Sequence, residues 1–250
     1  MEHHVGEEQA ASSLILKKVN NMFGDTDLMT AQTKALAINR TMQLKPSQYI
    51  SEKTEKSLVV LHFTAGTTAQ SAFNSWATDT RRVGTPYIVD RDGTVFEVFD
   101  PRCWAYALGV KDSAATAIER RALQIEIANV GPLKRKGDDL YWWPKDFGAR
   151  YCGIGETGKY VHSAYRGFEY FATFTTQQEL AVCALVKQLC EQFNIPKVLP
   201  EGKLMVSDLA FFSKFKGIAS HQNFRSDKFD VGPAFFWPEL NDTLRRVPTR

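Results

Sequence analysis

The chain contains 250 residues, of which 44% are hydrophobic and 24% are charged, and its formal net charge is +3. These proportions are typical of a soluble globular protein with one large domain, or with one domain and extensions. The small positive charge argues against a nucleic-acid-binding protein, although it would favour acidic polymers. No apolar run in the sequence approaches the roughly 20 residues that a membrane-spanning helix needs, so membrane insertion is not expected.

Residues 1–56 are polar, and we expect them to form an N-terminal helical arm with helices near 9–23 and 29–41. Apolar side chains recur every four residues in the first of these helices, which gives it an amphipathic face. We interpret the arm as a packing element of the main domain, with a separate binding module as the alternative. Because Met1–His4 is not followed by a basic segment and an apolar core, we expect no secretory signal.

The main domain is predicted over residues 57–250, with strands and helices in alternation. The expected elements are a strand at 57–64, a helix at 68–82, strands at 85–90, 94–99 and 121–128, a helix at 176–193, a short helix at 207–215, a strand before His221 and a closing helix at 237–244. The sum is an α/β (α+β) fold with a central mixed β-sheet flanked by helices.

Three local patterns support these assignments. The strand at 57–64 is continuously apolar, as expected for a strand covered on both faces. An Asp-Gly pair at 92–93 predicts a hairpin between two strands. Thr176 and Glu179 have the spacing of a capping box at the start of the longest helix.

In the strand at 121–128 the side chains alternate. Leu123, Ile125 and Ile127 are expected on one side of the strand, which leaves Gln124 and Glu126 on the other.

The four cysteines form no CxxC pair. Cys183 and Cys190 lie seven residues apart on a predicted helix, which separates them by roughly 10 Å along its axis. A disulfide needs Cα atoms within about 7 Å. We therefore expect reduced thiols, two of them buried on one helix face.

Residues 131–174 are rich in glycine and aromatic residues and show weak periodicity. We interpret this segment as a long ordered insertion or loop, a kind of segment that is often functional in a compact domain. Two aromatic runs stand out at 141–144 and 165–168. His162 lies near them and is interpreted as a loop histidine.

Two histidines and an aspartate carry the strongest chemical signal. His62 ends the apolar run at 57–64, and His221 follows a second apolar run, with Asp230 nine residues later. Taken singly, each fits a hydrogen-bonded core histidine or a loop carboxylate. Together they form a three-ligand set that leaves a fourth Zn²⁺ position open, which is typical of a catalytic zinc site.

Two further residues could act beside such a metal. Glu126 lies in an otherwise apolar strand, where it is either a solvated carboxylate or a proton shuttle with a raised pKa. Lys228 lies two residues before Asp230, where it is either a surface lysine or an ammonium group that stabilises an oxyanion.

These segments resemble the zinc-dependent N-acetylmuramoyl-L-alanine amidase family, which includes phage lysozyme-type amidases and peptidoglycan recognition proteins. The similar segments occur in family order, at 59–66, 87–95, 123–129 and 221–237. The resemblance implies the amidase fold of the peptidoglycan recognition proteins over residues 57–250. It also implies that His62, His221 and Asp230 are the zinc ligands. Glu126 and Lys228 would be the catalytic residues. Tyr87, Trp104 and Asn129 would contact the substrate.

The sequence departs from the family pattern at four positions. Ala107 stands where the family often has a histidine that contacts substrate, and Gln124 replaces a small glycine. Pro86 replaces the usual histidine before Tyr87. A proline commonly follows the third ligand, whereas here Pro233 comes two residues later than that position.

The resemblance implies hydrolysis of the amide bond between N-acetylmuramic acid and L-alanine in peptidoglycan. The alternatives are a non-catalytic module that binds this muramyl peptide, and a phage structural adaptor on the same fold. Aromatic residues of the 131–174 segment, namely Trp142, Trp143, Tyr165 and Phe168, would then stack on sugars or form a small satellite core. We expect synthesis in the cytoplasm and action on the wall after release, with cytosolic recycling as the alternative. The sequence does not fix the oligomeric state.

Overall fold

The structure is a computed structural model that describes residues 36–111, 115–143 and 148–246. Contacts between Cα atoms divide the chain after Leu36, and the compact unit begins at Ala37. The helix expected at 9–23 and most of the one at 29–41 lie outside the described residues. The last residues of the second expected helix include a short strand, β1 (Ile38–Asn39), which joins the main sheet. The functional boundary after residue 56 stays a prediction.

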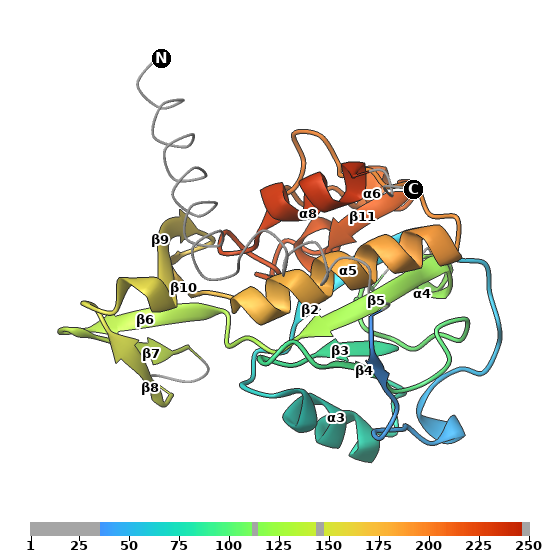
Figure 1. Cartoon of the computed structure of the whole chain (residues 1–250), viewed down its shortest axis with the longest axis horizontal. Coiled ribbons are helices and arrows are strands. Elements are labelled where there is room, and N and C mark those ends of the chain that lie inside the picture. The colour runs from blue at the N-terminus through green and yellow to red at the C-terminus, as the bar shows by residue number, and fades with distance from the viewer. Residues whose placement is uncertain (1–35, 112–114, 144–147, 247–250) are drawn as a thin grey trace, which may run out of the picture. The chain divides into compact units, whose positions relative to one another are not determined.

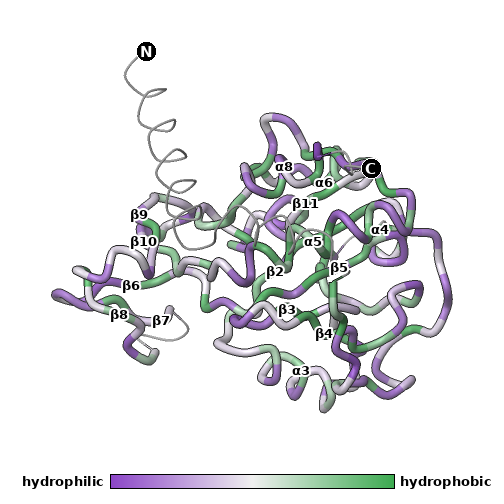
Figure 2. The backbone as a smooth tube through the Cα atoms, in the orientation of Figure 1, coloured by the Kyte–Doolittle hydropathy of each residue, from purple (hydrophilic) through white to green (hydrophobic). Residues whose placement is uncertain are grey.

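A mixed six-stranded sheet forms the centre of the compact unit, as the sequence predicts (Figure 1). Its strands run in the order β1-β4-β3-β5-β2-β11, and only the pairing between β3 and β4 is antiparallel. Besides β1, the strands are β2 (Leu58–Phe63), β3 (Tyr87–Val89), β4 (Val95–Glu97), β5 (Ala122–Ile127) and β11 (Gly217–Ser220). Strand β2 is buried along its whole length and β5 along nearly all of it, and Figure 2 shows hydrophobic residues in both strands.

Helices cover this sheet. They are α3 (Ala69–Thr78), α4 (Ala115–Arg121), α5 (Thr176–Gln192), α6 (Leu209–Phe212), α7 (His221–Phe224) and α8 (Trp237–Arg245), with short 3₁₀ helices at Pro46–Gln48 and Thr157–Lys159. The longest, α5, runs along β5 in the view of Figure 1 and packs on α8. Helix α3 packs on Ile88 of β3 through Ala69 and Trp76. Helix α4, directly before β5, has no counterpart among the predicted elements.

The capping box of α5 lies one residue earlier than predicted. The Thr175 hydroxyl accepts a hydrogen bond from the Gln178 amide, and the Gln178 side chain accepts one from the Thr175 amide, both at 3.1 Å. The Gln178 side chain is fully buried and also donates to the Ala128 carbonyl at 2.8 Å. This second contact joins the start of α5 to the end of β5 and explains why Gln178, rather than Glu179, completes the box.

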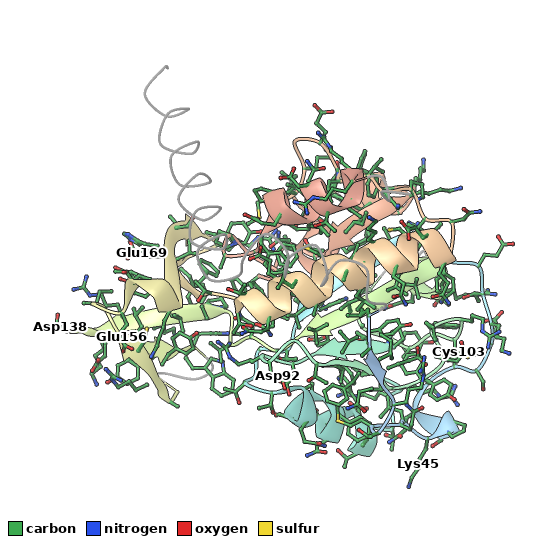
Figure 3. The ribbon with its side chains drawn as sticks, in the orientation of Figure 1. Lys45, Asp92, Cys103, Asp138, Glu156 and Glu169 are labelled. Atoms are coloured by element: carbon green, nitrogen blue, oxygen red, sulfur yellow. The ribbon has the colours of Figure 1, made fainter. Side chains whose placement is uncertain are left out.

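Residues 131–174, which we expected to be an insertion or loop, contain a second sheet. Its five strands are β6 (Pro132–Lys136), β7 (Asp139–Trp142), β8 (Arg150–Gly153), β9 (Tyr160–Tyr165) and β10 (Phe168–Ala172), antiparallel in the order β8-β7-β6-β10-β9. The sequence of this segment shows only weak periodicity, which is why it did not reveal the strands. Figure 3 labels Asp138, Glu156 and Glu169 on this sheet, where they lie away from β2 and β5.

Trp142 and His162 both contact residues of the second sheet itself. Trp142 packs against the small core of this sheet, formed by Leu133, Leu140, Cys152 and their neighbours. His162 stacks on the Tyr170 ring, with 4.7 Å between ring centroids.

Two further expectations concern the cysteines and the membrane. Cys103, Cys152, Cys183 and Cys190 are buried free thiols, as predicted. Within the described part of the chain, no helix is both long enough and apolar enough to cross a bilayer.

Candidate metal centre and active site

The register of three parallel strands brings the predicted histidines together. Strand β11 pairs with β2 so that Ser220 lies opposite Leu61. His221, the first residue of α7, directly follows Ser220, and His62 directly follows Leu61, so the two histidines lie at the same level of the sheet. On the other side of β2, Glu126 of β5 lies directly opposite His62.

The loop after α7 returns the predicted carboxylate to the histidines. The Gln222 amide donates to the Asp230 carbonyl at 2.8 Å, and the Gly232 amide donates to the Gln222 side chain at 3.1 Å. Gln222 is fully buried, so these bonds are not exchanged with water. They fix the carboxylate of Asp230 beside His221.

Three potential ligand atoms converge in this buried place. The Nδ1 atoms of His62 and His221 are 3.1 Å apart, and the Asp230 Oδ2 atom lies 3.3 Å from the first and 2.9 Å from the second. All three residues are at least nine-tenths buried. In a tetrahedral zinc site with ligands at about 2.0–2.1 Å from the ion, neighbouring ligand atoms are about 3.3–3.4 Å apart. The three separations are close to this value.

The other ring nitrogens identify the protonation state of the two imidazoles. His221 Nε2 lies 2.8 Å from the Leu108 carbonyl, which can only accept, so Nε2 carries the proton. His62 Nε2 lies 2.8 Å from Gln124 Oε1, which also accepts. In the neutral rings, both Nδ1 atoms therefore present lone pairs to each other and to the Asp230 carboxylate.

Such an arrangement of lone pairs and negative charge fits a cation. Burial raises the pKa of the Asp230 carboxyl, whereas a positive charge at His221 and His62 lowers it well below its usual range. Neutral imidazole and carboxylate are ligands that Zn²⁺ prefers. The donor set is thus chemically suited to this metal.

A buried carboxylate that the sequence analysis did not identify stands behind the histidines. Glu119 of α4 accepts hydrogen bonds from the side chain of Gln124, at 2.6 Å, and from the Leu108 amide, at 2.9 Å. Only 2% of Glu119 is exposed. Burial raises the pKa of its carboxyl, while its hydrogen bonds act in the opposite direction. Gln124, on the same face of β5 as Glu126, was the signal that could have revealed a buried partner.

A cavity of about 290 Å³ opens onto the three ligand atoms. Its walls come from the end of β2, from α3 and the segment between α3 and β5, from β5 and Trp143, and from α7 and the loop around Asp230. The lining residues are His62, Phe63, Thr64, Ala65, Trp76, Val83, Gly84, Ala107, Glu126, Trp143, His221 and residues 227–230. The predicted catalytic residues Glu126 and Lys228 thus both line the cavity that contains the ligand set. Ala107, at the position where a histidine was noted as missing, also lines it.

Glu126 has the electrostatic properties of a proton acceptor. Burial raises the pKa of its carboxyl to about 7, and the Asp230 carboxylate acts in the same direction. His62 and Lys228 lower this pKa. A carboxyl group with a pKa near neutrality can both accept and return a proton.

The three predicted substrate contacts do not line the cavity. Tyr87 lies opposite Ile125 in the sheet, on the face away from Glu126, and its hydroxyl donates to Glu97 at 3.1 Å. The Trp104 indole donates to Glu52 at 3.2 Å.

The Asn129 side chain joins the end of β5 to the second sheet through hydrogen bonds. Its side-chain amide donates to the carbonyls of Ala172 and Thr173, at 3.2 and 3.1 Å, and its oxygen accepts from the Gly131 amide at 2.7 Å. Every polar atom of the Asn129 side chain thus has a protein partner.

Comparison with solved structures gives a set of similar chains, and those described next are all of low identity. AmiD from E. coli, in complex with anhydro-N-acetylmuramic acid-L-Ala-D-gamma-Glu-L-Lys, is 18% identical with a TM-score of 0.48, and the match covers 78% of this chain and 59% of AmiD. PlyL is 14% identical with a TM-score of 0.46, over 84% of this chain and 98% of PlyL. AmpDh3 from Pseudomonas aeruginosa is 15% identical with a TM-score of 0.45, over 83% of this chain and 66% of AmpDh3.

The sequence comparisons address the family directly. No curated protein sequence matches the chain significantly. The family model described as N-acetylmuramoyl-L-alanine amidase matches residues 52–233. This match covers more than half of the chain and includes all three residues that converge at the candidate metal centre. The chain belongs to the N-acetylmuramoyl-L-alanine amidase family.

Proposed function

We propose that this protein hydrolyses the amide bond between N-acetylmuramic acid and L-alanine in peptidoglycan, and that the activity requires zinc. The observation that carries the proposal is the convergence of His62, His221 and Asp230 in a cavity that Glu126 also lines. Family membership supports the bond that is cleaved. The donor geometry supports the metal.

His62, His221 and Asp230 would hold the zinc ion through two imidazole nitrogens and one carboxylate oxygen. When bound, zinc supplies Lewis-acid chemistry, which polarises a carbonyl group and makes a water molecule more acidic. The remaining steps depend on the side chains around the cavity.

Glu126 is the proposed proton carrier. Its carboxylate accepts a proton from the attacking water, whose oxygen bonds to the carbonyl carbon of the substrate. The carbon–nitrogen bond then breaks, and Glu126 returns the proton to the leaving amine of L-alanine. The muramic acid side keeps the new carboxylate, so the atoms of one water molecule are divided between the two products.

Lys228 is the proposed electrostatic stabiliser. It lines the same cavity, and its positive charge opposes the negative charge that develops on the carbonyl oxygen during attack. Ala107 presents no polar side chain to the cavity. Lys228, two residues before Asp230, presents an ammonium group to it.

We further propose that residues 57–250 form the catalytic unit, with residues 1–56 as a helical arm and residues 131–174 as an insertion. The substrate is intact wall peptidoglycan, reached after release of the protein from the cytoplasm. Trp143, contributed by the second sheet, supplies an apolar wall of the cavity for the substrate.

The test is digestion of purified sacculi by the purified protein, combined with a measurement of its metal content. We expect about one zinc per chain, and release of free stem peptides that a chelator abolishes. The variant Glu126→Gln should retain zinc and lose turnover by at least about 100-fold.

Three outcomes would count against the proposal in different ways. A wild-type protein that binds zinc but releases no peptides would favour a non-catalytic module that binds peptidoglycan. Absence of zinc after reconstitution would refute the metal site. Full activity of Glu126→Gln would refute the role of this carboxylate alone.

A further inference from the structure

We infer that Glu119 and Gln124 are positioning residues that determine which nitrogen of His62 carries its proton and that hold His221 in place. The inference rests on the proposed metal site, because it concerns how the two ligand nitrogens are presented to the ion. It assigns a role to a glutamine that departs from the family pattern and to a buried glutamate outside the cavity.

A continuous set of hydrogen bonds joins one carboxylate to both imidazoles. Glu119 accepts from the Gln124 side chain at 2.6 Å, and Gln124 in turn accepts from His62 Nε2 at 2.8 Å. Glu119 also accepts from the Leu108 amide at 2.9 Å, and the Leu108 carbonyl accepts from His221 Nε2 at 2.8 Å. Glu119 is therefore linked by hydrogen bonds to the Nε2 atoms of both histidines, through Gln124 and through Leu108.

The arrangement leaves no freedom to the Gln124 side chain. Glu119 receives donors on both oxygens, since the Ala107 and Leu108 amides contact Oε1 and Gln124 contacts Oε2. The amide group of Gln124 must therefore turn its nitrogen to Glu119 and its oxygen to His62. Gln124 and Glu119 are each only 2% exposed, so water does not substitute for either contact.

This orientation has a direct consequence for metal binding. An oxygen facing His62 Nε2 requires a proton on that nitrogen, which leaves the lone pair on Nδ1, the atom that faces His221 and Asp230. Histidine ligands of metals generally have their second nitrogen fixed by such a hydrogen bond, and loss of the partner typically lowers metal affinity by about 10–100-fold.

The variant Glu119→Gln would reverse the orientation. If the new amide keeps its oxygen on the Leu108 amide, its nitrogen faces Gln124, which must then turn its own oxygen toward residue 119. The Gln124 nitrogen would then face His62 Nε2 and force the proton onto Nδ1. His62 would lose the lone pair that faces the metal.

The double variant Glu119→Gln with Gln124→Glu should restore the original state. A carboxylate at position 124 accepts both from the new amide at 119 and from His62 Nε2, so Nδ1 is again free of a proton. A residue that only fills space would not show this dependence on which of the two positions carries the carboxylate.

The experiment measures zinc affinity by competition with a chromophoric chelator, and the histidine tautomers by ¹⁵N NMR of the metal-free protein. For the wild type and the double variant we expect both histidines protonated on Nε2. For Glu119→Gln we expect His62 protonated on Nδ1 and zinc affinity reduced by about 10–100-fold. The control Glu97→Gln removes a carboxylate bound to Tyr87 on the same sheet, and should change neither quantity.

The outcomes separate this inference from the proposed function. Unchanged zinc affinity and His62 tautomer in a folded Glu119→Gln variant would overturn the inference and leave the metal site intact. A wild type that binds no zinc would refute the metal site, while the NMR spectra would still test the tautomer. If Glu119→Gln does not fold, a folded double variant with weak zinc binding or an Nδ1 proton on His62 would overturn the inference.

Discussion

Arg166, in the turn between β9 and β10 of the second sheet, donates a hydrogen bond to the backbone carbonyl of Lys228. The same guanidinium donates to the carbonyls of Arg225 and Gln222, at 3.1 and 3.3 Å, and to the Ser207 hydroxyl at 2.6 Å. The second sheet is therefore attached to the loop that carries Lys228 and leads to the proposed ligand. Its hairpin supports the active site from outside the central sheet.

Replacement of Arg166 by methionine should loosen this loop. Hydrogen bonds from a charged donor contribute about 1.5–3 kcal/mol in favourable cases, so we expect a loss of stability in this range. We also expect kcat to fall by about tenfold, because each 1.36 kcal/mol of lost transition-state stabilisation costs a factor of ten. Hydrogen exchange of residues 222–230 should become faster. Zinc content should change little, since the ligand side chains keep their own contacts.

The matched control is Arg150→Met, which removes an arginine of the second sheet that pairs with Asp139 on the exposed surface. This variant should leave kcat and the exchange of the loop unchanged. Equal effects of the two substitutions would show that the second sheet acts only through its general stability.

Trp143 and Trp142 are neighbours with different environments, which allows a second test. Trp143 lines the cavity and contacts the ring of Phe229, with 5.6 Å between centroids, whereas Trp142 packs in the core of the second sheet. Trp143→Ala should raise KM by about 2–10-fold, the equivalent of about 0.5–1.5 kcal/mol for one aromatic contact. Trp142→Ala should instead lower the melting temperature. A KM that rises equally in both variants would argue against a substrate contact by Trp143.

Lys228 should contribute to kcat rather than to metal binding. Loss of one group that stabilises a developing oxyanion typically costs about 10²–10³ in kcat, and we expect Lys228→Met to fall in this range with KM and zinc content close to normal. Lys197→Met, which removes a lysine paired with Glu191 outside the cavity, is the control. Kinetics on a soluble muramyl peptide distinguish the two parameters, and a normal kcat in Lys228→Met would remove this residue from the mechanism.

If the proposed metal site is correct, zinc should stabilise the folded protein through His62, His221 and Asp230. At a free zinc concentration of 100 times Kd, binding contributes about 2.7 kcal/mol, which corresponds to roughly 5–10 °C in melting temperature for a domain of this size. The variant Asp230→Asn should lose most of this gain, because it removes the charged ligand. Calorimetry with zinc and with a chelator measures both. A melting temperature of the wild type that is the same with zinc and with a chelator would contradict the proposed site.

The convergence of His62, His221 and Asp230 could be predicted from the sequence because its information is local. His62 and His221 each follow an apolar strand, and a loop of nine residues carries Asp230. Parallel pairing of the two strands then suffices to bring the side chains together. The predicted alternation of β5 is confirmed for the same reason, since Glu126 lies opposite His62 and Ile125 lies opposite Leu61.

Other features depend on contacts that a local pattern does not contain. Glu119 stands in a charged run before two arginines and so resembles a solvent-exposed residue, yet its partners Leu108 and Gln124 bury it. The position of Tyr87 depends on the period of two in β3, which places it on the opposite face from Glu126. The short strands of the second sheet show no periodicity of their own.

Glu179 of α5 provides a prediction about pH that is independent of the metal. Burial raises the pKa of its carboxyl to about 7, and the neighbouring Glu239 acts in the same direction. In the unfolded chain this pKa lies near 4.3. Between these two values the folded state binds more protons than the unfolded state, so the free energy of unfolding should fall as pH rises from about 4.3 to 7 and the penalty should persist above it.

The variant Glu179→Gln should remove this penalty. We expect it to be more stable than the wild type by about 1–2 kcal/mol at pH 8, and to differ little from it near pH 4. The value at pH 8 is smaller than the full pKa shift would give, because Glu179 is only partly buried. Glu191→Gln, which makes the same replacement at an exposed position of α5, is the control. Urea unfolding at both pH values measures the effect. Equal stabilisation at pH 4 and pH 8 would show that the glutamine acts through packing or helix propensity rather than through the proton.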